Sequence, residues 1–329
     1  MMPKISIALS VLLLGYGAGA ASTFYVSTNS PNPAPPYATW DTAAHSIQPA
    51  VDAASDGDTV LVSAGEYLLT SQVTIAKAIL LRSAMGSGQT TLNGNSRDRC
   101  LWVSNTLAVV DGFTMFRGEG PDGAGIFLVG GTVQNCSIAN CYPTRSLPGA
   151  SVTMIGGVLS NSVVRYAFVE SRLVHCSNGG LITDCQITDG RMGTADGTGV
   201  YLVNSQLRNS IVARMTYQYG AGEHGAGVYA VSSTISGCTI TGNRAGRAGG
   251  GAYLEGCEMD RCTIVGNASG NMFGSAGLGG GIFAINSTIR SSLIASNGAA
   301  NGADSSGDGV VLGFGGGVYL RGGSLLDLR

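Results

Sequence analysis

Residues 228–243 read VYAVSSTISGCTITGN, and the pattern returns as AYLEGCEMDRCTIVGN at 252–267 and as IFAINSTIRSSLIASN at 282–297. Each copy holds a short β-type run with an aromatic second residue, followed by a second apolar run. The second run always starts seven residues after the first. This constant step, with glycine-rich stretches between the copies, indicates a chain that winds in similar turns.

The second run also recurs farther upstream. Its copies start 23 to 30 residues apart, at Val110, Val133, Leu159, Ile182, Leu207, Ile235, Met259 and Ile289. A period of this size is typical of a solenoid, in which each turn buries its apolar side only against its neighbours. The Leu/Asn consensus of a leucine-rich horseshoe is missing, and the glycines and short β-rich runs exclude helical repeats. The sequence therefore predicts an all-β fold, a right-handed parallel β-helix with a short N-terminal capping helix.

The third position of the second run predicts a sharp bend. It holds residue types that readily adopt a left-handed backbone, at Gly112, Asn135, Asn161, Asp184, Asn209 and Gly237. A bend here lets both flanking apolar residues point inward. Arg261 and Ser291 occupy the same position in later copies, and we expect bends of a different shape there.

The first residues read as an export signal. Met1–Ser22, MMPKISIALSVLLLGYGAGAAS, places Lys4 before an apolar run and ends in small residues. That apolar run is too short to span a bilayer, and the chain shows no second long one. We expect residues 1–20 to be a Sec-type signal peptide, and the mature protein to be secreted, extracellular or displayed on the cell surface without a transmembrane segment.

Two further parts follow the signal peptide. Residues 21–42 are expected to form an N-terminal extension and residues 43–329 the β-helix. Within the latter, the spacing of Ile47, Val51 and Ala54 predicts a short helix, and Thr59–Val62 predicts a strand. The sequence stops at GGGVYLRGGSLLDLR, inside a turn, without a recognisable C-terminal cap.

The composition excludes several classes of protein. The 329 residues include 52 glycines, only 12% are charged, and the formal net charge is −2. The glycines do not recur at every third position, which excludes collagen. Normal apolar content with low charge excludes a charged disordered chain. Nothing supplies the basic surface that a nucleic-acid partner requires.

These segments resemble a known family, secreted proteins with right-handed β-helix repeats in the pectate-lyase-like superfamily. SIQPAVDAASDGDTVLVSAGEY at 46–67 is similar to the family's N-terminal cap and first turn, and VVDGFTMFRG at 109–118 and the CTITGN and GGGAY repeats follow its pattern. The same repeats look like those of polymorphic outer-membrane or autotransporter passengers. The resemblance implies the fold and no single activity, because such scaffolds host unrelated functions. Of the polygalacturonase motifs, Glu223-His224-Gly225 only loosely resembles one, so no catalytic residue carries over.

The cysteines are expected to fill the core. Cys136, Cys185, Cys238 and Cys262 share one repeat position with serines of other copies. Neighbouring turns lie ~4.8 Å apart, slightly too far for an easy bridge between in-register side chains. Stacked thiols are therefore favoured over disulfides at this position, while pairing of the other four cysteines stays open.

An outward row of rings is the main candidate for ligand binding. In the first run the residues that flank the aromatic one are aliphatic, so strand alternation places the aromatic side chain outside. The candidate ligand-binding residues are Tyr201, Tyr229, Tyr253, Phe283 and Tyr319. The row has two interpretations, a platform that stacks on sugar rings and a ladder that stabilises the sheet.

Polar candidates lie in the insertions that precede this strand. Asp189, Asp196, Glu223 and His224 fall on consecutive turns and are the candidate catalytic acid/base set, although aspartates in loops often only make turns. His175 is expected to be structural.

A metal site has weaker support. Asp304, Ser306 and Asp308 have the spacing of oxygen ligands in a calcium loop, without its closing Glu. Bound Ca²⁺ is thus an alternative to a flexible insertion, and no cofactor is required.

Three functions remain open. The first is a secreted or surface protein that contacts a polysaccharide or surface glycan, adhesin-like and without catalysis. The second is a polysaccharide lyase or glycoside hydrolase with carboxylates in the insertion loops. The third is a structural stalk or autotransporter-type passenger. The glycan and the oligomeric state do not follow from the sequence.

Overall fold

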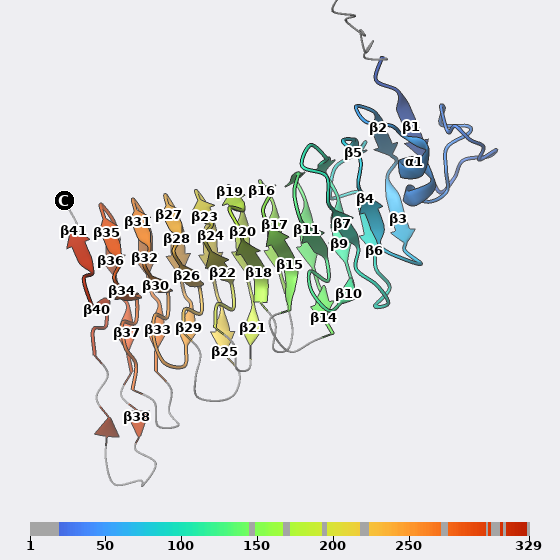
Figure 1. Ribbon diagram of the computed structural model, residues 1–329. Coiled ribbons are helices and arrows are strands. Elements are labelled where there is room, and N and C mark those ends of the chain that lie inside the picture. Colours follow the sequence, from blue (N-terminus) through green and yellow to red (C-terminus); the bar gives the residue numbers. More distant parts are fainter. Residues whose placement is uncertain are drawn as a thin grey trace, which may run out of the picture.

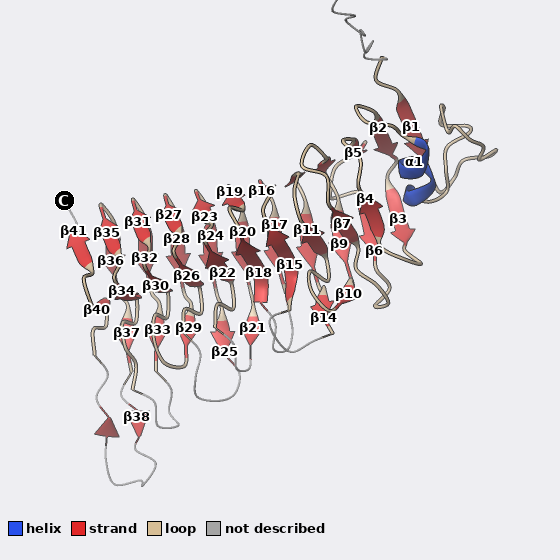
Figure 2. Ribbon diagram, viewed as in Figure 1, coloured by secondary structure: helices blue, strands red, loops and turns tan. Residues whose placement is uncertain are grey.

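The chain forms an elongated solenoid of short strands, with α1 (Ile47–Ala53) at its N-terminal end (Figures 1 and 2). The computed structural model describes residues 20–144, 149–166, 172–192, 196–217, 224–270, 276–300, 302–303, 310–311 and 314–327. Each turn of the solenoid adds one strand to each of three parallel sheets. The predicted all-β parallel β-helix with one short N-terminal helix is confirmed.

The first sheet carries the row of rings and is called the β4–β40 sheet. In spatial order it consists of β4 (Val73–Ile75), β7 (Leu101–Val103), β11 (Ile126–Leu128), β15 (Ala150–Ile155), β18 (Arg172–Ser177), β22 (Val200–Val203), β26 (Val228–Val231), β30 (Ala252–Glu255), β34 (Ile282–Ile285) and β40 (Val318–Arg321).

The second sheet, called the β1–β41 sheet, follows it in each turn. It consists of β1 (Thr23–Val26), β2 (Thr59–Val62), β5 (Leu80–Ser83), β8 (Val109–Asp111), β12 (Thr132–Gln134), β16 (Val158–Ser160), β19 (Leu181–Thr183), β23 (Gln206–Arg208), β27 (Thr234–Ser236), β31 (Glu258–Asp260), β35 (Thr288–Arg290) and β41 (Leu325–Asp327). Its first strand comes from residues 21–42, which the sequence suggested as an extension. In fact β1 pairs in register with β2 and belongs to the solenoid.

The third sheet, called the β3–β36 sheet, completes each turn. It consists of β3 (Gly65–Leu68), β6 (Thr90–Asn93), β9 (Thr114–Phe116), β13 (Ser137–Ala139), β17 (Val163–Arg165), β20 (Gln186–Thr188), β24 (Ile211–Ala213), β28 (Thr239–Thr241), β32 (Thr263–Val265) and β36 (Leu293–Ala295).

Short strand pairs extend the turns along one edge of the solenoid (Figure 1). They are β10 (Glu119–Gly120) with β14 (Tyr142–Pro143), β21 (Arg191–Met192) with β25 (Thr216–Tyr217), and β29 (Arg244–Ala245) with β33 (Ala268–Ser269) and β37 (Gly298–Ala299). An antiparallel pair, β38 (Gly302–Ala303) with β39 (Val310–Val311), lies beyond them. These segments lie in the insertions that precede each strand of the β4–β40 sheet.

The core is a column of aliphatic side chains in register. Val228 pairs with Ala252, and Ala252 with Ile282, on adjacent strands of the β4–β40 sheet, and all three are fully buried. The expected left-handed bends are present, for example at Asn209 with φ 46°. The expectation of different bends at Arg261 and Ser291 is wrong, since their φ values are 49° and 47°. Their backbone N–H groups bond to carbonyls of the next turn, as that of Asn209 does, so the stacked register imposes the conformation.

The cysteines form part of the core, since all eight are buried and none forms a disulfide bond. At the shared repeat position, the backbone N–H of each of the four cysteines donates to the side chain of the next turn. Cys136 donates to Ser162 Oγ at 3.1 Å, and Cys238 donates to Cys262 Sγ at 3.5 Å. Burial raises the pKa of the Cys136 thiol to about 12. Small side chains that accept one such bond therefore suit this position, whether Cys or Ser.

Among the described residues, no helix has the length and apolar character that crossing a bilayer requires. Of the predicted signal peptide, only Ala20 belongs to the described part of the chain.

Candidate functional site

The five predicted rings stack on consecutive strands of the β4–β40 sheet. Tyr201 and Tyr229 have ring centroids 5.0 Å apart, Tyr229 and Tyr253 4.8 Å, and the rings of each pair are parallel within 2°. Phe283 and Tyr319 continue the stack at 5.0 and 5.3 Å. The parallel pairing of strands produces this geometry, because it brings identical positions of neighbouring turns side by side.

The stack determines which part of each ring a ligand can reach. The faces of Tyr229, Tyr253 and Phe283 are covered by the neighbouring rings, so they are not open for a sugar ring to stack on. Phe283 is only 3% exposed, whereas the tyrosines are partly exposed. The accessible surface of the row is therefore made of ring edges and hydroxyl groups, which replaces the expected face-on platform.

The phenol hydroxyls of the row are available for hydrogen bonding. Those of Tyr201, Tyr229 and Tyr253 form no hydrogen bond with any described residue, and they are not among the buried unpartnered atoms. Burial of the ring and the carboxylate of Asp196 raise the pKa of Tyr229. Burial and Glu255 raise that of Tyr253. The hydroxyls of Tyr229 and Tyr253 therefore stay protonated at physiological pH and can donate.

Asp196 and His224 form a pair beside the stack. Asp196 Oδ1 lies 3.0 Å from His224 Nδ1 and also accepts the backbone N–H of His224 at 2.7 Å. The imidazole contacts the Tyr253 ring edge-on, with centroids 5.2 Å apart. Both side chains are about one-third exposed. Asp196 thus fixes the orientation of a solvent-accessible imidazole, which is a usual arrangement for proton transfer.

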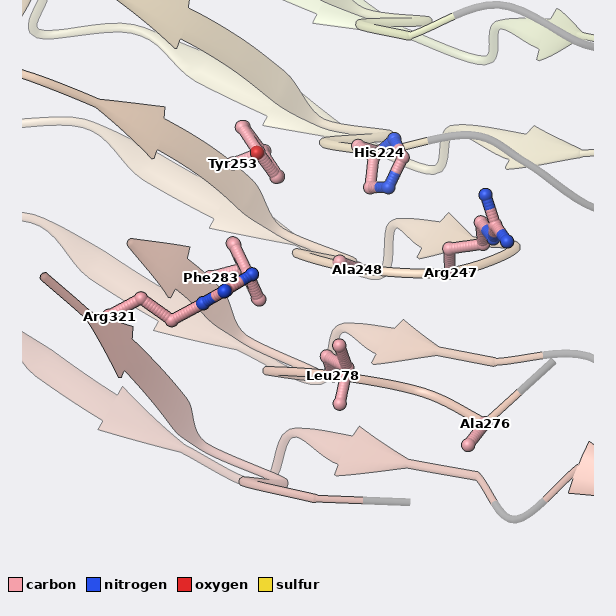
Figure 3. Close-up of a pocket in the computed structure, with 8 residues that line it drawn as sticks. All are labelled: His224, Arg247, Ala248, Tyr253, Ala276, Leu278, Phe283 and Arg321. Carbon is pink, nitrogen blue, oxygen red and sulfur yellow. The ribbon is translucent and has the colours of Figure 1, made fainter. Parts of the chain in front are cut away.

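A cavity of about 390 Å³ lies next to this pair (Figure 3). Figure 3 shows Tyr253 and Phe283 on neighbouring strands, with Arg247 and Leu278 on the segments that lead into them and His224 on the segment that leads into β26. Its lining is completed by Ala248, Ala276 and Arg321. The cavity joins aromatic edges to an imidazole and two guanidinium groups, so it suits a polar or anionic substituent of a small unit.

The other predicted catalytic residues are not part of this pair. Asp189 lies at the corner after the β3–β36 sheet, where both its oxygens bind the Arg214 guanidinium at 2.7 and 2.8 Å. This ion pair lowers the pKa of Asp189. With Tyr166, Arg191 and Thr216 it lines a separate cavity of about 320 Å³. Glu223 lies outside the described residues.

The predicted metal ligands cannot be placed, since Asp304, Ser306 and Asp308 lie outside the described residues. Within the described part of the chain, no three His, Cys, Asp or Glu side chains gather as a metal site would require.

Two buried arginines, Arg172 at the start of β18 and Arg99 two residues before β7, did not emerge from the sequence. Arg172 lies 4.0 Å above the Tyr201 ring centroid and donates from Nε to the backbone oxygen of Asp196 at 2.9 Å. Arg99 lies 4.9 Å from the Phe127 ring centroid and donates to the backbone oxygen of Asp122 in the same way. Arg99 lies two residues before the inward Leu101, and Arg172 lies two residues before the inward Val174. This shared spacing is the sequence feature that could have predicted their common position.

No known protein family and no curated protein matches the sequence. Among solved structures, pectate lyase Pel9A aligns with a TM-score of 0.54 at 15% identity, over 88% of this chain and 80% of that one. A rhamnogalacturonan lyase aligns over 92% and 87% with a TM-score of 0.44 at 11% identity. The Azotobacter vinelandii mannuronan C-5 epimerase AlgE6 A-module aligns over 85% and 92% with a TM-score of 0.39 at 16% identity. At these identities the likeness concerns the fold, and the chain is a right-handed parallel β-helix of the kind seen in pectate lyase Pel9A.

Proposed function

We propose that the protein binds a polysaccharide along the outer face of the β4–β40 sheet. The observation that carries the proposal is the row of phenol hydroxyls on Tyr201, Tyr229 and Tyr253, one on each of three neighbouring strands and without a hydrogen-bond partner among the described residues. A linear glycan presents hydroxyl groups repeatedly along its length, so a row of hydroxyl groups and aromatic edges complements it. The cavity beside His224 gives room for a side group of one sugar unit.

The row also stabilises the sheet, and the two roles are compatible. Parallel stacking holds the rings, while the hydroxyls at their edges stay free for a ligand. A purely structural ladder has no need of hydroxyl groups, because phenylalanine stacks equally well, as Phe283 does. The hydroxyls are therefore the feature to test.

A panel of pectate, alginate, xylan and mannan, titrated calorimetrically with and without Ca²⁺, tests the proposal. Pectate is included because the fold is shared with a pectate lyase. We expect at least one polymer to bind the wild type and the Tyr229→Phe/Tyr253→Phe double variant to lose about tenfold or more in affinity, since each lost hydrogen bond is worth ~1 kcal/mol. Tyr25→Phe, next to Trp40 at the N-terminal end, is the matched control and should bind normally.

Two results would reject glycan binding by the row. One is a wild type that binds no polymer of the panel, which favours the structural stalk. The other is a double variant whose affinity equals that of the wild type. A role in binding glycans also requires export of the protein, which fits the signal peptide proposed for residues 1–20.

Cleavage of the bound polysaccharide is the second candidate function, and the Asp196–His224 pair favours it. Because Nδ1 of His224 faces Asp196, Nε2 is the atom left to exchange a proton with a substrate. If the pair is catalytic, the wild type releases new reducing ends from the polymer it binds, and Asp196→Asn lowers that rate about 100-fold without changing binding. Absence of cleavage in the wild type, or full activity in Asp196→Asn, would exclude this function for the pair.

A further inference from the structure

The aromatic row of the β4–β40 sheet is interrupted by two polar residues. In register, Phe127 pairs with Thr153, Thr153 with His175, and His175 with Tyr201. Trp102 and Phe127 form an edge-on pair on one side of this interruption, and the five-ring stack begins on the other side. Three strand steps, about 14 Å at ~4.8 Å each, separate Phe127 from Tyr201. We call the two positions between them the gap.

Thr153 carries a buried hydroxyl that nothing in the structure explains. The residue is 5% exposed, and its Oγ1 has no hydrogen-bond partner. In the described part of the chain only Ser269 Oγ shares this condition. Leaving a buried hydroxyl unpaired is costly, so each case calls for a reason, and a ligand that completes the bond is one.

His175 brings a second polar group to the gap. Its ring meets Tyr201 edge-on at 5.3 Å and stays partly exposed. Burial and the nearby Arg172 guanidinium lower the pKa of His175, against a smaller opposing effect of Asp122. The imidazole is therefore neutral at physiological pH and offers one donor and one acceptor. No described residue forms a hydrogen bond with this ring.

Arginines mark the two sides of the gap. Arg99 packs against Phe127 and Arg172 against Tyr201, and their side chains are nine-tenths buried. Both are held by backbone carbonyls of the following turn, so they fix the ring next to them. The gap is thus a polar interval between two braced aromatic surfaces, in which His175 is partly exposed and Thr153 is buried.

We propose that the gap is a subsite for one hydroxyl-bearing sugar unit, which bonds to Thr153 Oγ1 and the His175 imidazole while the same chain continues along the tyrosine row. This inference rests on the proposed function and assigns residues for which the sequence suggested only a structural role or none. The ligand spans both regions, so only oligosaccharides long enough to reach from the stack to the gap use the subsite.

The test compares Thr153→Val with Ser269→Ala, which removes the other unpaired buried hydroxyl of the described residues and lies on β33, outside the β4–β40 sheet. The probes are oligogalacturonides of two to ten units, with xylo-, manno- and alginate oligosaccharides of the same lengths, titrated calorimetrically. We expect Thr153→Val to lose about tenfold in affinity for the longest oligosaccharides and nothing for the shortest that bind. Ser269→Ala should bind all lengths as the wild type does. Thermal unfolding confirms that both variants are folded.

His175→Phe provides an independent second variant, since it keeps an aromatic ring in the row and removes the polar atoms. It should show the same length-dependent loss. Equal affinity of wild type, Thr153→Val and His175→Phe for every length would overturn the subsite while leaving glycan binding by the tyrosines intact. A wild type that binds no oligosaccharide of any series would overturn both proposals.

Discussion

Replacing Tyr253 in the middle of the ring stack separates the structural role of the row from its hydroxyl chemistry. Tyr253→Ala removes two parallel ring contacts, at 4.8 Å to Tyr229 and 5.0 Å to Phe283. At ~1 kcal/mol for each contact and ~1 kcal/mol for the lost burial of a half-exposed ring, we expect a free-energy loss of about 3 kcal/mol. Tyr253→Phe keeps the stack and should change stability by less than ~0.5 kcal/mol.

Urea unfolding followed by circular dichroism measures the loss, and native-state hydrogen exchange locates it. Because a solenoid turn touches only its neighbours, protection should fall in β26, β30 and β34 and stay unchanged near α1. The reasoning fails if Tyr253→Ala costs less than ~1 kcal/mol, or if Tyr253→Phe is as destabilising as Tyr253→Ala. In the first case the rings do not stabilise the sheet, and in the second the hydroxyl has a structural partner.

Three further predictions concern the scaffold. Gly280→Ala should lower the melting temperature markedly or prevent folding, because the new methyl group would collide with the backbone of Gly298, whereas Gly298→Ala meets open space and should be tolerated in the same thermal scan. Asp189→Asn should cost at most ~1 kcal/mol at pH 7, since Arg214 is well exposed. Arg214 lowers the pKa of Asp189 in the folded state. The stabilisation by this ion pair is therefore present above the unfolded pKa of ~4 and disappears as pH falls through the folded pKa. A urea titration in which Asp189→Asn loses as much stability at pH 2 as at pH 7 would contradict this. Burial raises the pKa of Cys136 to about 12, and with all eight cysteines buried, a thiol reagent should label the native protein slowly and the unfolded protein fully; rapid labelling of native protein would contradict the packing.

The sequence was sufficient for the fold because the repeat carries its own register. The seven-residue step between Val228 and Ile235 fixes two strands of that turn and of the turns that share it, and alternation around Tyr229 fixes which side chains point outward. The bend at Arg261 could not be predicted in this way, since intrinsic preference argues against a left-handed arginine and only the stacked hydrogen bonds override it.

The site was predictable only in part. The register of the rings followed from the repeat. Whether neighbouring rings stack and cover each other's faces depends on side-chain torsions, which the repeat pattern does not specify. The positions of Asp189, Asp196, Glu223 and His224 in the insertions of consecutive turns suggested a common site. Asp189 and Asp196 flank β21 in the same insertion, however, and they bind different partners, Arg214 and His224. The gap at Thr153 and His175 could not be predicted from the repeat, because these two residues depart from the aromatic position that the other turns share.

The largest differences in length between turns lie at one corner, just before the β4–β40 sheet, and this determines how the protein can change by insertion and deletion. The corner between the first and second strands also takes an extra residue without loss of register, since Val174 and Ile182 lie eight residues apart and pair with Val200 and Leu207, which lie seven apart. Residues added just before the β4–β40 sheet disturb no strand, because the stacking resumes at the next glycine cluster. Newly acquired loops therefore accumulate beside the tyrosine row, so a lineage of such chains can diversify its ligand contacts while the column of aliphatic side chains beneath stays the same.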